Sequence, residues 1–233
     1  MVAPIVVFDL DGTLVDTAPD LVATLNVVFA RVGLPSVAYA EARNMVGGGA
    51  RKMIERGLAA EGRGLATAEI DQLVRDFIEH YAAHIADCSR PFTGLEAALD
   101  QLAQDGCRLA VCTNKLEWLA RRLLDALGLT HRFVAVCGAD TFGLQKPDPQ
   151  LLTCTIRHAG PSPGRAVMVG DSISDIAMGK AAGIPVIAVD YGYTETPVAE
   201  LGADRVIGDL ADLPRAVFEL MGGAKSVPAS PPA

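Results

Sequence analysis

Short apolar segments that alternate with helical patterns set the strongest limit on what this chain can fold into. Five nearly continuous apolar runs lie at residues 5–8, 109–112, 134–137, 166–169 and 185–189. Strands that are buried on both faces of a parallel sheet have this composition. Between the runs, leucines at helical spacing precede Gly106 and Gly128, where a helix would end. The sequence therefore predicts an α/β fold with a doubly wound parallel sheet.

A long segment after the first apolar run departs from this alternation. Residues 21–32 and 70–81 keep helical spacing, and no convincing strand lies near them. Pro19 suits the first turn of the first helix, Gly33 suits its end, and Thr67 is a candidate N-cap for the second. We therefore expect an all-helical cap over residues 17–87, inserted into an α/β core made of residues 1–16 and 88–221. The Pro-, Ala- and Gly-rich residues 222–233 are expected to form a mobile tail.

Net charge, hydropathy and cysteine content limit the partners and the compartment that can be expected for this protein. The net charge of −8 argues against a nucleic-acid partner, which needs clustered Lys and Arg. No apolar run approaches the length of a membrane span, and the N-terminus lacks a basic leader. The five cysteines are odd in number and contain no CxxC pair. Because Cys107, Cys112 and Cys137 lie in or beside apolar runs, we expect buried thiols in a reducing compartment. We expect a cytoplasmic protein without a membrane partner, and the sequence leaves its oligomeric state open.

Two aspartates follow the first apolar run at once, in the order Asp9, Leu10, Asp11, Gly12. Carboxylates spaced in this way on extended backbone repel each other unless a proton or a cation lies between them. Mg²⁺ prefers such oxygen ligands together with water and substrate phosphate. Two alternatives remain: a turn in which Asp and Gly only cap the strand, and a calcium loop with Asp20 at its twelfth position.

Three further polar clusters follow later apolar runs. Thr113 and Asn114 would add donors for phosphate at a helix start, although this cluster taken alone favours an ordinary N-cap. Lys146 stands in a turn stiffened by prolines and could neutralise carboxylates, or could be a solvated surface lysine. Asp171 ends a strand, and Asp175 begins the next helix, where it could merely serve the helix dipole. Together the four clusters predict one site at the carboxyl edge of the sheet.

The same residues resemble the haloacid dehalogenase superfamily of phosphatases. The match consists of Asp9 to Thr13, Thr113, Lys146 with its proline, and Gly170 to Asp175, and it extends over residues 1 to about 220, cap included. Residues 8–20, 46–49, 113–115 and 138–149 resemble its phosphoglycolate phosphatase branch. The resemblance implies a phosphomonoesterase for a small phosphorylated metabolite, 2-phosphoglycolate first.

The resemblance also implies a role for each site residue. Asp9 would attack phosphorus and form an aspartyl-phosphate, and Asp11 would protonate the leaving alkoxide and then deprotonate the hydrolytic water. The set of Mg²⁺ ligands would comprise the side chains of Asp9 and Asp171 and the backbone carbonyl of Asp11. The transferring phosphoryl group would be held by Thr113, Asn114 and Lys146, and the supporting residues would be Ser172 and Asp175, the latter orienting a metal-bound water or Lys146.

The expected cap contains a glycine run that could read the substrate. Gly48 and Gly49 precede Arg51 and Lys52, and free backbone N–H groups beside positive charge would suit the carboxylate of 2-phosphoglycolate. A flexible helix start with solvated cations is the alternative. Other functions also remain open: a phosphatase for sugar phosphates or pyrophosphate, a phosphomutase, and a degenerate sensor of phosphorylated ligands. A dehalogenase is disfavoured because its reaction has no alkoxide for Asp11 to protonate.

Overall fold

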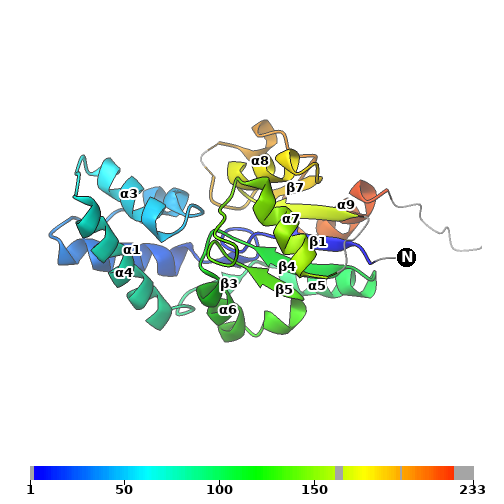
Figure 1. The fold of residues 1–233 in the computed structure, drawn as a ribbon, viewed down its shortest axis with the longest axis horizontal. Coiled ribbons are helices and arrows are strands. Elements are labelled where there is room, and N and C mark those ends of the chain that lie inside the picture. Colours follow the sequence, from blue (N-terminus) through cyan, green and yellow to red (C-terminus); the bar gives the residue numbers. More distant parts are fainter. Residues whose placement is uncertain (1–2, 161–164, 195, 223–233) are drawn as a thin grey trace, which may run out of the picture.

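The protein consists of a helical unit at one end and a sheet flanked by helices at the other, as Figure 1 shows for the computed structural model. The structure describes residues 3–160, 165–194 and 196–222. The tail predicted at 222–233 lies outside this range apart from Gly222. No helix in these ranges is long and apolar enough to cross a bilayer.

The core sheet has six parallel strands in the order β5-β4-β1-β6-β7-β8. Their bounds are Ile5–Phe8 (β1), Arg108–Cys112 (β4), Ala135–Cys137 (β5), Ala166–Gly170 (β6), Val186–Val189 (β7) and Arg205–Ile207 (β8). The predicted α/β fold and all five predicted strands are confirmed. The edge strand β8 was not predicted, because it is only three residues long and two of them are exposed.

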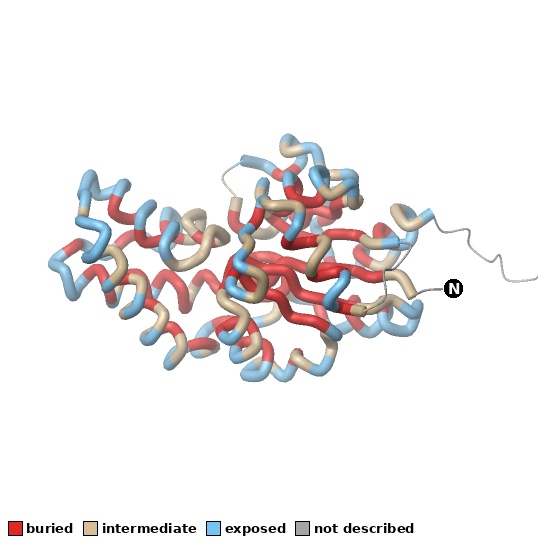
Figure 2. The backbone as a smooth tube through the Cα atoms, in the orientation of Figure 1, coloured by how far each residue is buried: buried red, intermediate tan, exposed pale blue. Residues whose placement is uncertain are grey.

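Helices cover both faces of the sheet. Their bounds are Leu95–Gln104 (α5), Glu117–Ala126 (α6), Pro149–His158 (α7), Ile173–Ala181 (α8) and Leu213–Leu220 (α9), with 3-10 turns at 130–132, 198–200 and 210–212. Alternate residues of β1 belong to the hydrophobic clusters on the two faces: Val6 and Phe8 share one cluster with Leu99 of α5, and Val7 shares the other with Leu151 of α7. The inner strands β1, β4, β6 and β7 are therefore buried along nearly their whole length, as the red segments of Figure 2 show.

The helical unit lies between β1 and β4 in the chain. It contains α1 (Ala18–Arg31), α2 (Tyr39–Ala42), a 3-10 turn (Arg43–Met45), α3 (Ala50–Ala60) and α4 (Thr67–Ala83). Pro19 lies in the first turn of α1, and Gly33 with φ +69° follows its end, as predicted. The predicted N-cap at Thr67 is wrong, because Thr67 is the first helical residue and the Glu69 carboxylate instead accepts a hydrogen bond from the backbone N–H of Ala66.

A two-stranded antiparallel ribbon joins the helical unit to the core. It pairs β2 (Val15–Asp16) with β3 (Arg90–Pro91), so both crossings of the chain lie side by side. Next to the ribbon, the buried Asp20 carboxylate accepts hydrogen bonds from the backbone N–H groups of Cys88 and Ser89 and from the Ser89 hydroxyl, at 2.6–3.1 Å. Asp20 therefore fastens the two crossings together and is not the twelfth ligand of a calcium loop.

The five cysteines are free thiols and form no disulfide. Cys112 and Cys137 are buried in the sheet, as predicted, and burial raises the pKa of the Cys112 thiol to about 12. The prediction of a buried thiol is wrong for Cys107, which is only half-buried because it lies just before the amino end of β4.

Candidate functional site

The carboxyl end of β1 places Asp9 and Asp11 at the edge of the sheet that faces the helical unit (Figure 1). β1 lies between β4 and β6, so Thr113 and Asp171 follow the two strands that flank it. The backbone N–H of Asp9 extends the strand pairing by donating to the carbonyl of Val169 at 2.9 Å. The parallel sheet thus brings together residues that are more than a hundred positions apart in sequence.

Asp171 is held in place by donors from the first loop and from the loop after β7. The Thr13 hydroxyl donates to Oδ1 at 2.9 Å, and the backbone N–H of Tyr193 donates to Oδ2 at 2.8 Å. Gly12 has φ +85°, and a Cβ at this position would lie 2.5 Å from Oδ2 of Asp171. Glycine is therefore required here both by the backbone conformation and by the close approach of the carboxylate.

Lys146 projects into the carboxylates from the loop before α7. Its Nζ lies 2.7 Å from Oδ1 of Asp9 and 2.6 Å from Oδ1 of Asp175. The backbone N–H and the hydroxyl of Ser172 donate to the other oxygen of Asp175, at 3.1 and 2.6 Å. Asp175 therefore orients Lys146, which is one of the two roles expected for it, and the alternative of a solvated surface lysine is wrong because Lys146 is buried.

The charges of this buried group are unbalanced. Burial raises the pKa of Asp9 to about 8, with Lys146 opposing the shift and Asp175 and Asp171 adding to it. Burial and Asp175 likewise raise the pKa of Asp171 to about 6, against the two hydrogen bonds that Thr13 and Tyr193 give it. Burial alone would lower the pKa of Lys146, but the neighbouring carboxylates raise it, so the ammonium stays charged.

These residues fit a divalent metal ion. Carboxylate oxygens of Asp9, Asp171 and Asp175 all lie within 4.8 Å of one another. Oδ1 of Asp9 is buried and accepts no hydrogen bond in the described part of the chain, since the ammonium beside it lies outside hydrogen-bond geometry. Three carboxylates opposed by one lysine repel one another, and a hard cation with oxygen ligands would remove that repulsion. Mg²⁺ is such a cation.

Thr113 and Asn114 lie beside this group at the end of β4, and both are buried. The Asn114 side chain bridges two loops: its oxygen accepts from the backbone N–H of Lys146 at 2.8 Å, and its amide donates to the carbonyl of Gly47 at 3.2 Å. The Thr113 hydroxyl accepts from the backbone N–H of Lys115 at 3.2 Å. Asn114 therefore connects the Lys146 loop to the helical unit, a contact that the sequence did not predict.

Asp11 is paired with a second buried lysine. Nζ of Lys115 lies 3.1 Å from Oδ1 of Asp11, and the Thr17 hydroxyl donates to the same oxygen at 2.7 Å. Lys115 also donates to the hydroxyl of Tyr81 on α4 at 3.2 Å and lies 4.4 Å from the centre of its ring. Burial alone would lower the pKa of Lys115, but Asp11 and Tyr81 raise it, so this lysine is charged as well.

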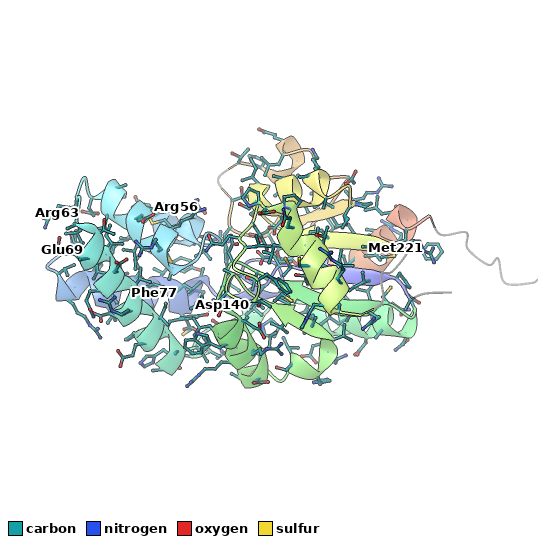
Figure 3. All side chains as sticks on the ribbon, viewed as in Figure 1. Arg56, Arg63, Glu69, Phe77, Asp140 and Met221 are labelled. Carbon is teal, nitrogen blue, oxygen red and sulfur yellow. The ribbon has the colours of Figure 1, made fainter. Side chains whose placement is uncertain are left out.

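The glycine run of the helical unit lies directly before α3 and faces the core. Gly49 has φ +84°, and a Cβ there would lie 3.3 Å from the carbonyl oxygen of Asn114. Arg51 forms ion pairs with Asp71 and, at 3.7 Å, with Glu55 on the exposed side of α3. Figure 3 shows the helical unit as a separate lobe, with Arg56, Arg63 and Glu69 labelled on it.

The structure brings together Asp9, Asp11, Thr113, Asn114, Lys146, Asp171, Ser172 and Asp175. Of the cap candidates, Arg51 is instead engaged by the acidic side chains of Asp71 and Glu55. Lys115, Tyr81 and Tyr193 were not predicted as site residues. A signal for Lys115 was present, because it directly follows Thr113 and Asn114. No such signal was present for Tyr81 or Tyr193, since each lies far along the chain from the site residue that it contacts, Lys115 or Asp171.

Comparisons with known proteins agree with this geometry. Residues 6–189 match the family model described as haloacid dehalogenase-like hydrolase. A phosphoglycolate phosphatase from Agrobacterium fabrum is 49% identical, with 93% of each chain covered. An N-acetylmuramic acid 6-phosphate phosphatase from Pseudomonas aeruginosa is 36% identical, again with 93% of each chain covered. A crystal structure of a predicted phosphoglycolate phosphatase from Haemophilus somnus superposes with a TM-score of 0.83 at 28% identity, covering 91% of this chain and 96% of that one.

Proposed function

Because the chain belongs to the haloacid dehalogenase-like hydrolase family, we propose that it is a Mg²⁺-dependent phosphomonoesterase that uses Asp9 as its nucleophile. One observation carries the proposal. The Asp9 carboxylate stands beside Lys146 and the acidic pair Asp171 and Asp175, with Asp11 two residues further on. This arrangement supports attack on phosphorus by a carboxylate whose charge is offset by its neighbours.

The reaction takes place in two displacements. A carboxylate oxygen of Asp9 forms a bond to phosphorus while the ester P–O bond breaks, and Asp11 gives its proton to the departing alkoxide. Asp11 then takes a proton from a water molecule whose oxygen attacks the aspartyl-phosphate, so phosphate leaves and Asp9 is restored. Lys146 and Thr113 hold the oxygens of the transferring group, and Asp175 keeps Lys146 in place.

The Mg²⁺ ligands would be the carboxylates of Asp9 and Asp171 together with the backbone carbonyl of Asp11. When bound, the ion neutralises the charge of the phosphate and of the carboxylates around it. Thr13 and the backbone of Tyr193 orient Asp171 for this purpose through their hydrogen bonds.

We assign residues 17–87 as the cap, and 2-phosphoglycolate as the substrate that the relative from Agrobacterium fabrum supports best. A cap would exclude water from the site and contact the leaving group. The contacts of Asn114 with Gly47 and of Lys115 with Tyr81 support this assignment, because they join the helical unit to the site itself.

A phosphatase for a phosphorylated sugar is the second candidate. The relative from Pseudomonas aeruginosa, named for a sugar phosphate and 36% identical, favours it. The two substrates differ in what lies beyond the ester oxygen: a carboxylate in one and a ring with hydroxyl groups in the other. The residues around Asp9 would act on the phosphate ester of either substrate. Substrate specificity would therefore depend on the residues that line the cavity between cap and core.

One assay tests the proposal: phosphate release from 2-phosphoglycolate and from hexose phosphates, with and without Mg²⁺, for the wild type and for Asp9→Asn. We expect turnover of 2-phosphoglycolate that requires Mg²⁺, and a loss of about 10⁴-fold or more in the variant, because an amide is not a nucleophile here. Asp105→Asn, an exposed aspartate between α5 and β4, is the matched control. Retained activity in Asp9→Asn would exclude the mechanism.

A further inference from the structure

A cavity of about 290 Å³ lies between the helical unit and the core. Asp11 lines it from the core, and the glycine run at 47–49 lines it from the cap. In the proposed mechanism Asp11 delivers the proton to the leaving oxygen, so that oxygen must lie at the Asp11 end of the cavity. Whatever is attached to the leaving oxygen then occupies the space beyond it.

Three cationic side chains line this cavity: Arg51, Lys52 and Lys115. The guanidinium of Arg51 is already bound by Asp71 and Glu55. Lys52 is exposed, and its aliphatic part folds over Gly48, where a Cβ would lie 2.7 Å from its Cδ. Lys115 differs from both, because it is buried and reaches the cavity at its Asp11 end.

The ammonium of Lys115 has one donor left. It has three N–H groups, and in the described part of the chain its partners are Asp11 at 3.1 Å and the Tyr81 hydroxyl at 3.2 Å. Tyr81 accepts in that hydrogen bond, so its own O–H proton is free to be donated. The cavity therefore receives two adjacent donors, one charged and one neutral, from the core and from the cap.

We propose that Lys115 and the Tyr81 hydroxyl bind the carboxylate of the substrate and select phosphorylated 2-hydroxy acids of the smallest size. This inference rests on the proposed function and names its specificity residues. In 2-phosphoglycolate a single methylene separates the ester oxygen from the carboxyl carbon. Because Asp11 protonates the leaving oxygen, a carboxylate one methylene away from that oxygen must lie close to Asp11. A cation that binds this carboxylate must therefore also lie next to Asp11, and Lys115 does so. Arg51 and Lys52, which the sequence suggested for this task, lie on the other side of the cavity, on α3.

Because Lys115 belongs to the core and Tyr81 to the cap, substrate selectivity also depends on the position of the cap. Lys115 comes from the loop after β4, and Tyr81 comes from the far end of α4. Both donors can contact the same carboxylate only while the cap is seated on the core as it is here. A phosphate ester of the same size whose leaving group carries no carboxylate would leave the buried charge of Lys115 without its second anionic partner, and would bind less well for that reason.

The test compares 2-phosphoglycolate with ethyl phosphate, in which a methyl group replaces the carboxylate. Steady-state kcat and KM are measured for both esters in the wild type, Lys115→Met, Tyr81→Phe, Arg51→Met and Lys52→Met. Lys180→Met, an exposed lysine on α8, is the control for loss of a positive charge. Circular dichroism and thermal unfolding show whether each variant is folded.

We expect Lys115→Met to lower the preference for 2-phosphoglycolate over ethyl phosphate by roughly 10²-fold, chiefly through KM for the acid. Tyr81→Phe, which keeps the lysine and the ring, should lower the same preference by about 3- to 10-fold, as loss of one hydrogen bond does. Lys180→Met should leave it unchanged. The Tyr81 variant decides the question if Lys115→Met does not fold.

Two results would overturn the inference. If Lys115→Met and Tyr81→Phe reduce turnover of both esters by the same factor, the pair serves Asp11 or the fold and does not recognise the carboxylate. If Arg51→Met or Lys52→Met alone removes the preference, the cap cations are the recognition site. Failure of the proposed function is distinguishable from both, because the wild type would then hydrolyse neither ester.

Discussion

The charge balance of the site can be tested without substrate by the replacement Lys146→Met. Lys146 is buried between two carboxylates at 2.7 and 2.6 Å, and methionine keeps most of its volume while removing its charge. Removing one member of a buried ion pair costs about 3–5 kcal/mol, because the other charge is left without a partner. For a chain of this size, each kcal/mol shifts the unfolding midpoint by about 2–4 °C. We therefore expect a fall of roughly 6–20 °C in chelator at about pH 7.5.

The loss of stability in Lys146→Met should depend on pH, and the direction follows from the pKa of Asp9. The pKa of Asp9 is raised from 3.8 to about 8 on folding, so the folded state binds the extra proton and stability falls as pH rises through that window. Removing the ammonium raises this pKa further, so Asp9 of the wild type loses its proton between about pH 7.5 and about pH 9 while Asp9 of the variant keeps it. The penalty of Lys146→Met must therefore be larger at about pH 9 than at about pH 7.5. Thermal unfolding in chelator at both values measures it, with Lys180→Met as the control.

An equal loss of stability at the two pH values would refute the reasoning, since it would mean that Lys146 contributes packing and not charge. Addition of Mg²⁺ provides a second test. A divalent ion bound to the same carboxylates would neutralise part of the negative charge that Lys146 neutralises. Saturating Mg²⁺ should therefore recover part of the stability lost in Lys146→Met and raise the stability of the wild type as well.

Three further substitutions test other contacts. Asp20→Asn replaces the acceptor of the Ser89 hydrogen bonds at the ribbon and should lower the free energy of unfolding in urea by about 2–4 kcal/mol. Gly12→Ala places a methyl group 2.5 Å from Oδ2 of Asp171 and should weaken Mg²⁺ binding about 10- to 100-fold in calorimetric titration. Tyr193→Phe leaves the buried backbone N–H of Ala18 without its acceptor and should cost about 1–3 kcal/mol, measured as above; an unchanged midpoint would contradict it.

The sequence was sufficient to predict the part of the site that the sheet assembles. Asp9, Thr113 and Asp171 each follow a buried strand, and a parallel sheet brings the carboxyl ends of neighbouring strands together whatever the sequence between them. The strand order was not needed in detail, because a doubly wound sheet makes its first strand central. Lys146 could be included because the superfamily resemblance supplied a role that its own turn did not.

The contacts between cap and core could not be predicted in the same way. Lys115 meets Tyr81 only because α4 packs where it does, and no local pattern specifies how a helical insertion sits on its sheet. A buried tyrosine on an amphipathic helix is more commonly a core residue, and Tyr81 is one: it packs against Phe77 with ring centres 6.2 Å apart. Its second role, at the hydroxyl end, depends entirely on tertiary structure.

Tyr193 shows how closely the placement of the cap is tied to the chemistry. Its backbone N–H holds Asp171, and its hydroxyl contacts both Asp16 and the backbone N–H of Ala18, where the chain enters the cap. From the cap, Arg43 stacks on its ring at 5.3 Å and donates to the neighbouring backbone carbonyl at 3.2 Å. A displacement of the cap at these contacts acts on the residue that positions the carboxylate of Asp171. The site therefore has its full set of contacts only while the cap packs on the core as it does here. Lys115 and Tyr81, proposed to bind the substrate carboxylate, and Asp171, which lies beside Asp9, depend on the same packing between cap and core.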